Sequence, residues 1–341
     1  MSCSAAAVFV NRRPLAWNRS APQLCVVVDT EEEFDWGTPF SREATAVSAM
    51  RHQEPAQRLF ERFGIVPAYM ITWAVASQAE GRQPLREFLA AGACEVGAHL
   101  HPWINPPLLE PVSRSNSYAG NLPPALELAK LRLLTSCIEQ ELGVRPVLYK
   151  AGRYGLGPHT AEALEQLGYK VDLSALPHHD LRADGGPDYR FLDATPFRFG
   201  PSGRLLELPM TVGFSGVLRR HGAPWFESAT RGLGRRLRVG GVLARSGLIE
   251  RIRLSPEGID HRAHRRLVRA LLDGGQRLFS LTYHSPSLMA GCTPYVRDAA
   301  GLERFTDTIE RFLDFFMGEL GGEATTPTRL AAEAEALASS A

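Results

Sequence analysis

Acidic residues follow directly on the most apolar run of the sequence. The run Leu24–Thr30 reads LCVVVDT and leads into Glu31, Glu32 and Glu33. Residues two apart on a strand face the same side, so Asp29 and Glu31 are expected to point together at the carboxyl end of this strand. Active sites of α/β folds are built at that end. An exposed acidic turn is the alternative for this segment taken alone.

Two histidines occupy the equivalent place after a second apolar run. His99 and His101 lie two residues apart in EVGAHLHPW, which ends the run Cys94–Leu100. Two imidazoles on one face, completed by a carboxylate, are a workable ligand set for a first-row metal ion. A lone pair with this spacing is a weak signal. Two polar pairs at two carboxyl strand ends make a coincidence less plausible, and one divalent ion, with zinc as the expected metal, is predicted here.

Other strand ends carry hydrogen-bonding or titratable groups as well. His284 closes the run LFSLTYH, Lys150 precedes Arg153 and Tyr154 in KAGRY, and Asp172 lies in YKVDLS. A histidine buried in the core is the alternative for His284. Polar groups at several strand ends are the distribution of a barrel active site.

The elements that must position these residues alternate along the chain. Short apolar runs predict seven strands, and segments of helical period predict six helices between and after them. The predicted strands are Leu24–Thr30, Val66–Thr72, Cys94–Leu100, Pro146–Ala151, Tyr169–Ser174, Leu205–Met210 and Leu278–His284. The predicted helices are Glu54–Phe63, Leu85–Ala91, Pro123–Leu142, Thr160–Leu167, His261–Asp273 and Gly301–Glu319. This order predicts parallel β-α units, either in a doubly wound sheet or in a closed barrel.

Two segments depart from this alternation. Phe214–Leu254 carries nine arginines against only two acidic residues. It is expected to be a helical insert, either the solvated face of amphipathic helices or a lid that attracts a phosphate- or carboxylate-bearing substrate. Residues 1–320 are expected to form a single domain, and the Ala/Glu/Thr-rich residues 321–341 a flexible tail.

Composition excludes several classes of protein. The 341 residues hold 38 Lys and Arg against 37 Asp and Glu, so a surface that coats nucleic acid is not expected, and no nucleic-acid module is found. Five cysteines without short spacings argue against a disulfide framework or a zinc finger. No apolar run is long enough for a membrane span, and the N-terminal charges are in the wrong order for a signal peptide. A cytoplasmic α/β protein is the expectation.

The order of these motifs resembles the polysaccharide deacetylase family, also called the NodB homology domain or carbohydrate esterase family four. The resemblance runs from Leu24 to His284, and the wording VDTEEEFDW and GAHLHPW is similar to a divergent branch associated with cell-wall or exopolysaccharide products. It implies a distorted (β/α)7 barrel. It also implies hydrolysis of an N-acetyl or O-acetyl group on a sugar or glycan precursor.

The resemblance also implies roles for the site residues. Glu31, His99 and His101 would hold the metal ion, and Asp29 would be the general base, although Asp29 and Glu31 could exchange roles. His284 would be the general acid, with Asp172 orienting it.

The remaining roles concern the transition state and the substrate. Tyr154 would stabilise the oxyanion through its backbone N–H, and Arg153 or Lys150 would keep Asp29 ionised, with Lys150 also near the substrate. Candidates for stacking on a sugar ring are Trp36, Trp73, Trp103 and Tyr118.

Three other functions remain open at this point. A retaining glycoside hydrolase would use two carboxylates, such as Glu31 and Asp172, about 5 Å apart and would need no paired histidines. A carbohydrate-binding descendant would keep the barrel without catalysis. A metal-dependent amidase would act on a small molecule instead of a glycan.

Overall fold

A computed structural model describes residues 8–15, 17, 19–222, 224, 226 and 239–339. Its strands are β1 (Arg13–Pro14), β2 (Gln23–Thr30), β3 (Ala68–Ile71), β4 (Glu95–Leu100), β5 (Leu148–Ala151), β6 (Val171–Asp172), β7 (Phe197–Phe199), β8 (Leu205–Glu207), β9 (Val212–Ser215), β10 (Glu250–Arg253), β11 (Leu278–His284) and β12 (Glu323–Ala324).

All seven predicted strands are present, and they form one parallel sheet. Their order in space is β8-β6-β5-β4-β3-β2-β11, and β7 and β1 continue it antiparallel beyond β8. Within the described chain no ladder joins β8 to β11. Thr211, which follows β8, nevertheless exchanges hydrogen bonds with Ser280 of β11. Its hydroxyl accepts from the Ser280 N–H at 2.8 Å, and its N–H donates to the Ser280 hydroxyl at 3.1 Å. The structure therefore shows a mixed α/β fold with a central parallel sheet, and a closed barrel remains a prediction.

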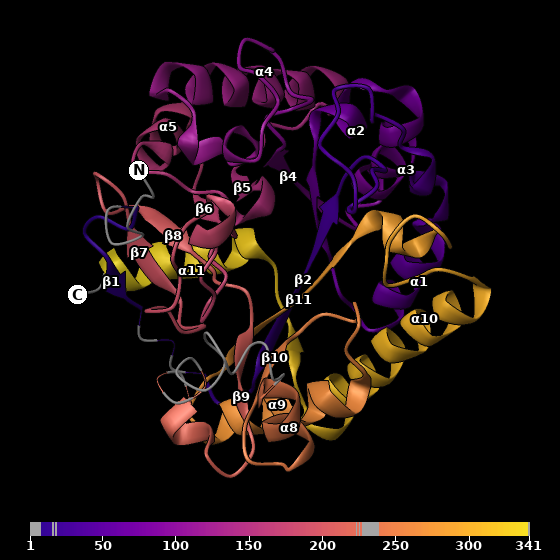
Figure 1. The fold of residues 1–341 in the computed structure, drawn as a ribbon, viewed down its shortest axis with the longest axis vertical. Coiled ribbons are helices and arrows are strands. Elements are labelled where there is room, and N and C mark those ends of the chain that lie inside the picture. The colour runs from indigo at the N-terminus through magenta and orange to yellow at the C-terminus, as the bar shows by residue number, and fades with distance from the viewer. Residues whose placement is uncertain are drawn as a thin grey trace.

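Helices surround this sheet (Figure 1). They are α1 (Glu54–Arg62), α2 (Trp73–Ser77), α3 (Ala79–Ala90), α4 (Pro124–Leu142), α5 (Thr160–Leu167), α8 (Val239–Arg245), α9 (His261–Asp273), α10 (Ala299–Leu313), which continues as a π-helical turn Asp314–Glu319, and α11 (Pro327–Ser339). Each of the six predicted helices overlaps one of these. The helix expected at Leu85–Ala91 begins earlier, at Ala79, because its first turns carry few apolar residues that would reveal the period.

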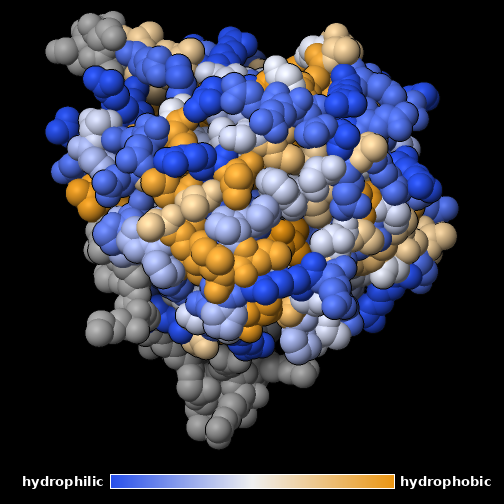
Figure 2. Space-filling model, turned by 90° about the horizontal axis from the view of Figure 1, so that it is seen from above, coloured by the Kyte–Doolittle hydropathy of each residue, from blue (hydrophilic) through white to orange (hydrophobic). Residues whose placement is uncertain are grey.

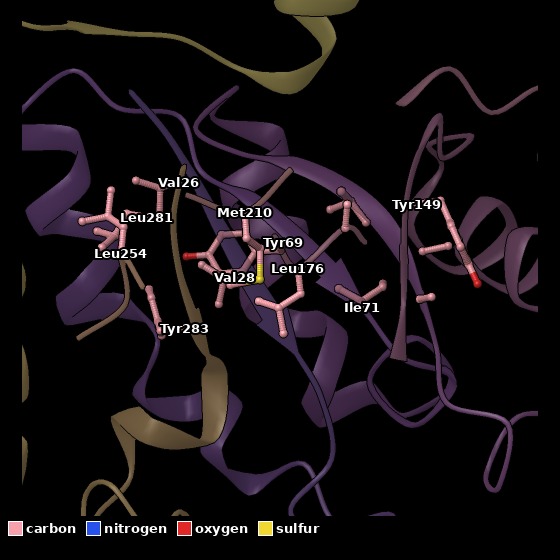
Figure 3. Packing of buried hydrophobic residues seen from close by; sticks show 14 of the residues in the cluster. Val26, Val28, Tyr69, Ile71, Tyr149, Leu176, Met210, Leu254, Leu281 and Tyr283 are labelled. Carbon is pink, nitrogen blue, oxygen red and sulfur yellow. The ribbon is translucent and has the colours of Figure 1, made fainter. Parts of the chain in front are cut away.

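Alternate residues of the strands supply two apolar layers. Val26 and Val28 of β2 face the cluster that includes Leu281 and Tyr283 of β11, where Figure 3 shows their side chains gathered. Cys25, Val27 and the residues in register with them face the other side and form a second cluster. We call this second side the inner face. Two buried faces explain why these strands read as continuous apolar runs.

The C-terminal segment differs from the expected tail. Residues 323–324 pair with β2, and α11 packs against the inner face through Leu330, Ala331 and Ala334, which are almost fully buried. Leu330 and Ala334 are four residues apart and share one side of the helix. An apolar stripe this narrow in a chain rich in Ala and Glu is easily read as tail, and it becomes a docking surface only because the sheet offers an apolar face.

The described ends of the arginine-rich insert are paired strands. Its two ends, β9 and β10, form an antiparallel ladder in which Arg253 lies opposite Val212. Helical structure within the described part is limited to a short turn at Arg219–His221, the isolated positions 222, 224 and 226, and α8. Arg231, Arg235, Arg236 and Arg238 lie outside the described residues. The antiparallel pairing was missed because Glu250-Arg251-Ile252-Arg253 offers a single buried apolar residue, Ile252.

Figure 2 shows the face formed by α4, where apolar residues gather in the middle and hydrophilic ones surround them. The loop after β4 is tied to α4 by the fully buried Lys130, whose ammonium donates to the carbonyls of Pro102, Asn105 and Pro107 and pairs with Glu110. This loop forms one wall of the site described below.

None of the described helices has the length and apolar character needed to cross a membrane.

The packing of α11 predicts a difference between two leucines of that helix. Leu330→Ala should lower the free energy of unfolding by about 2–5 kcal/mol, because it leaves a cavity between α11 and the inner face. Leu337→Ala, at a position that is 51% exposed, should change it by no more than about 0.5 kcal/mol. Urea denaturation followed by circular dichroism measures both. Equal effects of the two substitutions would show that α11 does not dock.

Candidate active site

The strand register brings four polar residues to the carboxyl edge of the inner face. His284 lies opposite Asp29 between β11 and β2, and His99 lies opposite Lys150 between β4 and β5. Asp29 is also in register with Met70 of β3, and Met70 with Gly97 of β4. His99 follows Gly97 by two residues and therefore faces the same side. Parallel pairing alone thus assembles groups that are far apart in the sequence.

Glu31, His99 and His101 form a buried group that could hold a metal ion. The Oε2 atom of Glu31 lies 3.7 Å from Nε2 of His99 and 3.4 Å from Nε2 of His101, and ligand atoms of the three lie within 4.8 Å of one another. Oε1 of Glu31 is buried and has no hydrogen-bond partner among the described residues. Two imidazole nitrogens and an unsatisfied carboxylate oxygen converging on one point are the donor set expected for zinc or a similar divalent ion.

Each histidine of this group is oriented through its other ring nitrogen. His99 Nδ1 lies 3.0 Å from the carbonyl of Lys150, and His101 Nδ1 lies 2.7 Å from Oε1 of Glu32. Donation from Nδ1–H leaves Nε2 of both rings free to bind a cation. Burial lowers the pKa of His99, whereas for His101 Glu32 outweighs burial and raises the pKa.

Glu32 was not predicted as a site residue. In a strand, Glu32 would face the side opposite to Asp29 and Glu31, so alternation alone places it outside the site. It is fully buried all the same, because the chain leaves the β2 ladder after Thr30 and the side chain turns beneath His101.

A glycine allows the close approach of the loop after β5 to His101. A Cβ atom at Gly152 would lie 2.5 Å from Cδ2 of His101 and 2.5 Å from the carbonyl oxygen of Leu100. Any larger residue would push these groups apart. The Gly in KAGRY is therefore needed for the packing of the site.

Asp29 forms a buried ion pair with Lys150. Nζ of Lys150 lies 2.6 Å and 2.8 Å from the two carboxylate oxygens of Asp29, and both side chains are at most 5% exposed. Burial alone would raise the pKa of Asp29, but Lys150, with smaller effects from His99 and His284, lowers it below the usual value. Lys150 thus lies behind Asp29 and is absent from the cavity wall, which differs from its expected contact with substrate.

His284 is paired with Glu257, a residue that the sequence analysis did not identify. His284 Nδ1 lies 2.8 Å from Oε2 of Glu257, while Nε2 lies 3.7 Å from Oδ2 of Asp29. Burial would lower the pKa of His284, but Glu257, helped by Glu31 and Asp29, raises it to about 9. The loop SPEG that carries Glu257 has no periodicity or motif that would mark it in the sequence.

Asp172 does not take the role expected for it beside His284. Its carboxylate accepts a hydrogen bond from the Ser174 hydroxyl and lies next to Glu207, in register on β8. Burial of both groups raises the pKa of Asp172 to about 6 and that of Glu207 well above its usual value. Asp172 is paired with Tyr149 in the β5–β6 register, which places it on the side of the sheet opposite Lys150. A β5–β6 register shifted by one residue would have placed Asp172 on the same side of the sheet as Lys150.

A cavity of about 700 Å³ opens over the metal-ligand group, Asp29 and His284. Trp36, Trp103 and Tyr118 line it, whereas Trp73 is at the start of α2 and packs against the core. Trp103 stacks on His101 with 4.3 Å between ring centroids, and Trp36 meets His284 edge to face at 4.8 Å. Lining residues that were not predicted include Phe34, Phe40, Tyr295 and Arg253.

The turn after β5 has an unusual backbone. Arg153 and Tyr154 are consecutive non-glycine residues with positive φ, +55° and +61°. Such conformations are costly for L-residues and cluster at functional sites. Tyr189 donates a hydrogen bond from its hydroxyl to the carbonyl of Tyr154 at 2.5 Å and so supports the turn. Both Arg153 and Tyr154 line the cavity.

The Arg153 side chain is directed away from Asp29. Its guanidinium group lies over the Tyr118 ring, 4.2 Å from the centroid, and pairs with Asp184. Of the two cations considered for holding Asp29 ionised, Lys150 is the one that contacts it. Arg153 instead joins the turn after β5 to two loops on the cavity wall.

The fold is similar to solved structures of several enzymes. It matches a candidate polysaccharide deacetylase from Mycobacterium smegmatis with a TM-score of 0.56 and 16% identity, over 95% of this chain and 94% of that one. It matches Puue Allantoinase with a TM-score of 0.55 and 15% identity, over 93% and 91%. A GH57 branching enzyme from Thermococcus kodakaraensis matches with a TM-score of 0.50 and 14% identity, over 92% and 71%.

Likeness at such identities shows the fold alone, and the function must be argued from the site. No protein-family model matches the chain. No curated protein matches it at the level of sequence.

The contact between Glu32 and His101 predicts an effect on metal affinity. Glu32→Gln should weaken zinc binding by about 10- to 100-fold, because the amide orients the imidazole less strongly than the carboxylate. Glu33→Gln is the matched control, since Glu33 bonds to Ser48 and the Ala49 N–H and not to a histidine. Competition with a chromophoric chelator measures both affinities. Equal affinities in the two variants would contradict the role given to Glu32.

The His284–Glu257 pair predicts a loss of stability at alkaline pH. His284 has a folded pKa of about 9 against an unfolded value of 6.5, so the folded state binds more protons between these values. Its contribution is complete below pH 6.5 and is lost as the pH rises through 9. In metal-free protein the free energy of unfolding should fall across this range, and Glu257→Gln should flatten the fall. NMR titration of His284 in both proteins gives the pKa directly. A His284 pKa in the variant equal to that in the unmodified protein would contradict the pairing.

Proposed function

We propose that this protein is a metal-dependent hydrolase that removes an acetyl group from a sugar or glycan precursor. The observation that carries the proposal is the cavity floor, on which Glu31, His99 and His101 converge beside an acidic and a basic partner, Asp29 and His284. Hydrolysis of an amide or ester needs an activated water, an electrophilic contact for the acyl oxygen, and a proton donor for the leaving atom. The residues of this floor, with a bound metal ion, would provide for each need.

Asp29 is suited to accept the proton of the attacking water. Its ion pair with Lys150 keeps the carboxylate ionised despite burial, and it lines the cavity while Lys150 does not. The lysine thereby acts as a positioning residue that fixes the protonation state of the base and the direction of its carboxylate.

His284 is suited to give a proton to the leaving nitrogen or oxygen. Glu257 fixes its ring through Nδ1 and stabilises the imidazolium, which turns Nε2 toward the cavity and Asp29. The base and the acid thus have opposite charges at neutral pH, each set by a buried partner behind it. Pairs of titratable groups whose pKa values are shifted in opposite directions by their surroundings are typical of acid–base catalysis.

The residues fit the expected metal ion. A divalent ion held by Glu31, His99 and His101 would supply Lewis-acid chemistry, polarising the acyl carbonyl and a water molecule. Glu32 and the carbonyl of Lys150 would hold the two imidazoles in place. The ligand set favours zinc among common ions.

The turn after β5 is the proposed source of the oxyanion contact. The backbone of Tyr154 lies in a left-handed conformation on the cavity wall, a place from which its N–H group is proposed to reach the developing negative charge. The aromatic rings of Trp36, Trp103 and Tyr118 are proposed to hold the sugar.

The two-carboxylate glycosidase is less compatible with this geometry. It needs Glu31 and Asp172 in one site, and Asp172 belongs to the pair with Glu207 on the other side of the sheet. The similarity to a GH57 enzyme therefore reflects the fold and not this pair of residues. A carbohydrate-binding descendant without catalysis is the second candidate, and the experiment below separates it from a hydrolase.

Substitution of the proposed base predicts loss of rate with retention of metal. Asp29→Asn should lower kcat for acetate release by about 10²- to 10⁴-fold, as expected for removal of a general base, while one equivalent of zinc stays bound. His99→Ala should retain no zinc after dialysis. Acetate release from a panel of N- and O-acetylated sugars, together with elemental analysis, measures both.

The control is Asp35→Asn, an exposed residue of the same acidic segment, which should leave rate and metal content unchanged. Removal of the metal with a chelator should abolish acetate release, and added zinc should restore it. Zinc binding without acetate release from any sugar would favour the carbohydrate-binding descendant. Full activity in the chelated protein would contradict the proposal.

A further inference from the structure

The charged residues of the cavity fall into pairs that cancel and two groups that do not. Asp29 is neutralised by Lys150, and Glu257 by His284. Glu31 and Glu32 together balance a divalent ion. These contacts leave the floor of the cavity without net charge when a metal ion is present.

The side of the cavity at Asp184 carries an excess of positive charge. Both Arg153 and Arg114 pair with this one carboxylate, Arg114 through Nη1 at 2.8 Å from Oδ1. All three residues line the cavity, and Arg114 is 80% exposed at its mouth. One carboxylate cannot neutralise two guanidinium groups, so one positive charge remains.

Arg253 carries the second uncompensated charge. It projects from β10 into the cavity and is only partly exposed. No described carboxylate forms an ion pair with it, and its Nε–H is buried without a hydrogen-bond partner among the described residues. The carboxylate of Glu257 acts on Arg253 electrostatically, but it already accepts hydrogen bonds from His284 and Ser287. Its other polar neighbour is the Tyr295 hydroxyl.

A half-buried arginine without an anion is costly unless a ligand supplies one. Guanidinium groups match carboxylate and phosphate oxygens in geometry and charge. The cavity of about 700 Å³ is within the range of small-molecule sites and has room for a sugar with a further substituent. An excess of positive charge on its walls would also raise the local concentration of an anionic substrate.

We infer that the substrate is an acylated sugar bearing an anionic group, a carboxylate or a phosphate ester, and that Arg253 binds this group. The inference rests on the proposed hydrolase function, which it deepens by naming the class of substrate. Arg253 is thereby a specificity-determining residue of the cavity, and Arg114 and Arg153 contribute to attraction at its mouth.

Binding of deacetylated products tests the inference without turnover. Calorimetry on zinc-loaded protein should show that glucosamine 6-phosphate or muramic acid binds at least 10-fold more tightly than glucosamine. Arg253→Met should weaken binding of the anionic ligand by about 10- to 100-fold and leave glucosamine unchanged. The two ligands distinguish a phosphate from a carboxylate as the recognised group.

Two further variants keep the test sharp. Arg253→Lys retains the charge and should keep most of the preference, which also provides a readout if Arg253→Met does not fold. Arg132→Met, an exposed position on α4, removes one positive charge elsewhere and should change nothing. Equal binding of glucosamine and the anionic ligands by the unmodified protein, or an unchanged preference in Arg253→Met, would overturn the inference.

Failure of the inference and failure of the proposed function give different results. If neutral acetylated sugars release acetate as fast as anionic ones, and Arg253→Met behaves like the unmodified protein, the hydrolase stands and the anionic substrate does not. If Arg253→Met loses anion binding but no acetylated sugar of either kind releases acetate, the anion site stands and the hydrolase does not.

Discussion

The buried ion pair between Asp29 and Lys150 is the interaction on which the site depends. Two charges removed from water are stable only if they are close together and well bonded, and here both carboxylate oxygens contact the ammonium group. The pair joins β2 to β5 across the two strands between them. The carbonyl of the same residue, Lys150, also accepts the Nδ1 hydrogen bond of His99, so one residue positions both the proposed base and a proposed metal ligand.

The proposed base, acid and metal ligand share an arrangement in which each faces the cavity and has a buried partner behind it. Lys150 lies behind Asp29, Glu257 behind His284, and Glu32 behind His101. These partners fix protonation states and ring orientations that the cavity-facing groups would not hold alone in a buried site. The fold supports the arrangement with two apolar layers, one of which is completed by α11.

The cavity walls differ in character from its floor. The floor is balanced in charge once a metal ion is bound, whereas the walls combine aromatic rings with arginines from three separate segments of the chain. Arg253 comes from β10, a strand outside the main sheet, and Arg114 from the loop after β4. Arg253 and Arg114, which we propose to attract the anionic substrate, are thus on other structural elements than the proposed acid, base and metal ligands.

The sequence by itself determined the strands and the groups at their ends. Apolar runs long enough to be buried on both faces marked β2, β4 and β11. The alternation of side chains then placed Asp29 with Glu31, and His99 with His101, on one side of their own strands. This was possible because the period of a strand is local information.

Tertiary structure decided which residues contact the site groups and which sequence-based expectations were wrong. Glu32 and Glu257 contact histidines from loops whose course no local pattern encodes, and Asp172 faces away from the site because of the β5–β6 register. The choice of Lys150 over Arg153 as the partner of Asp29, and the docking of α11, likewise depend on which surfaces meet in the folded chain. Contacts between residues far apart in sequence arise only when the whole sheet assembles, and local sequence patterns do not predict them.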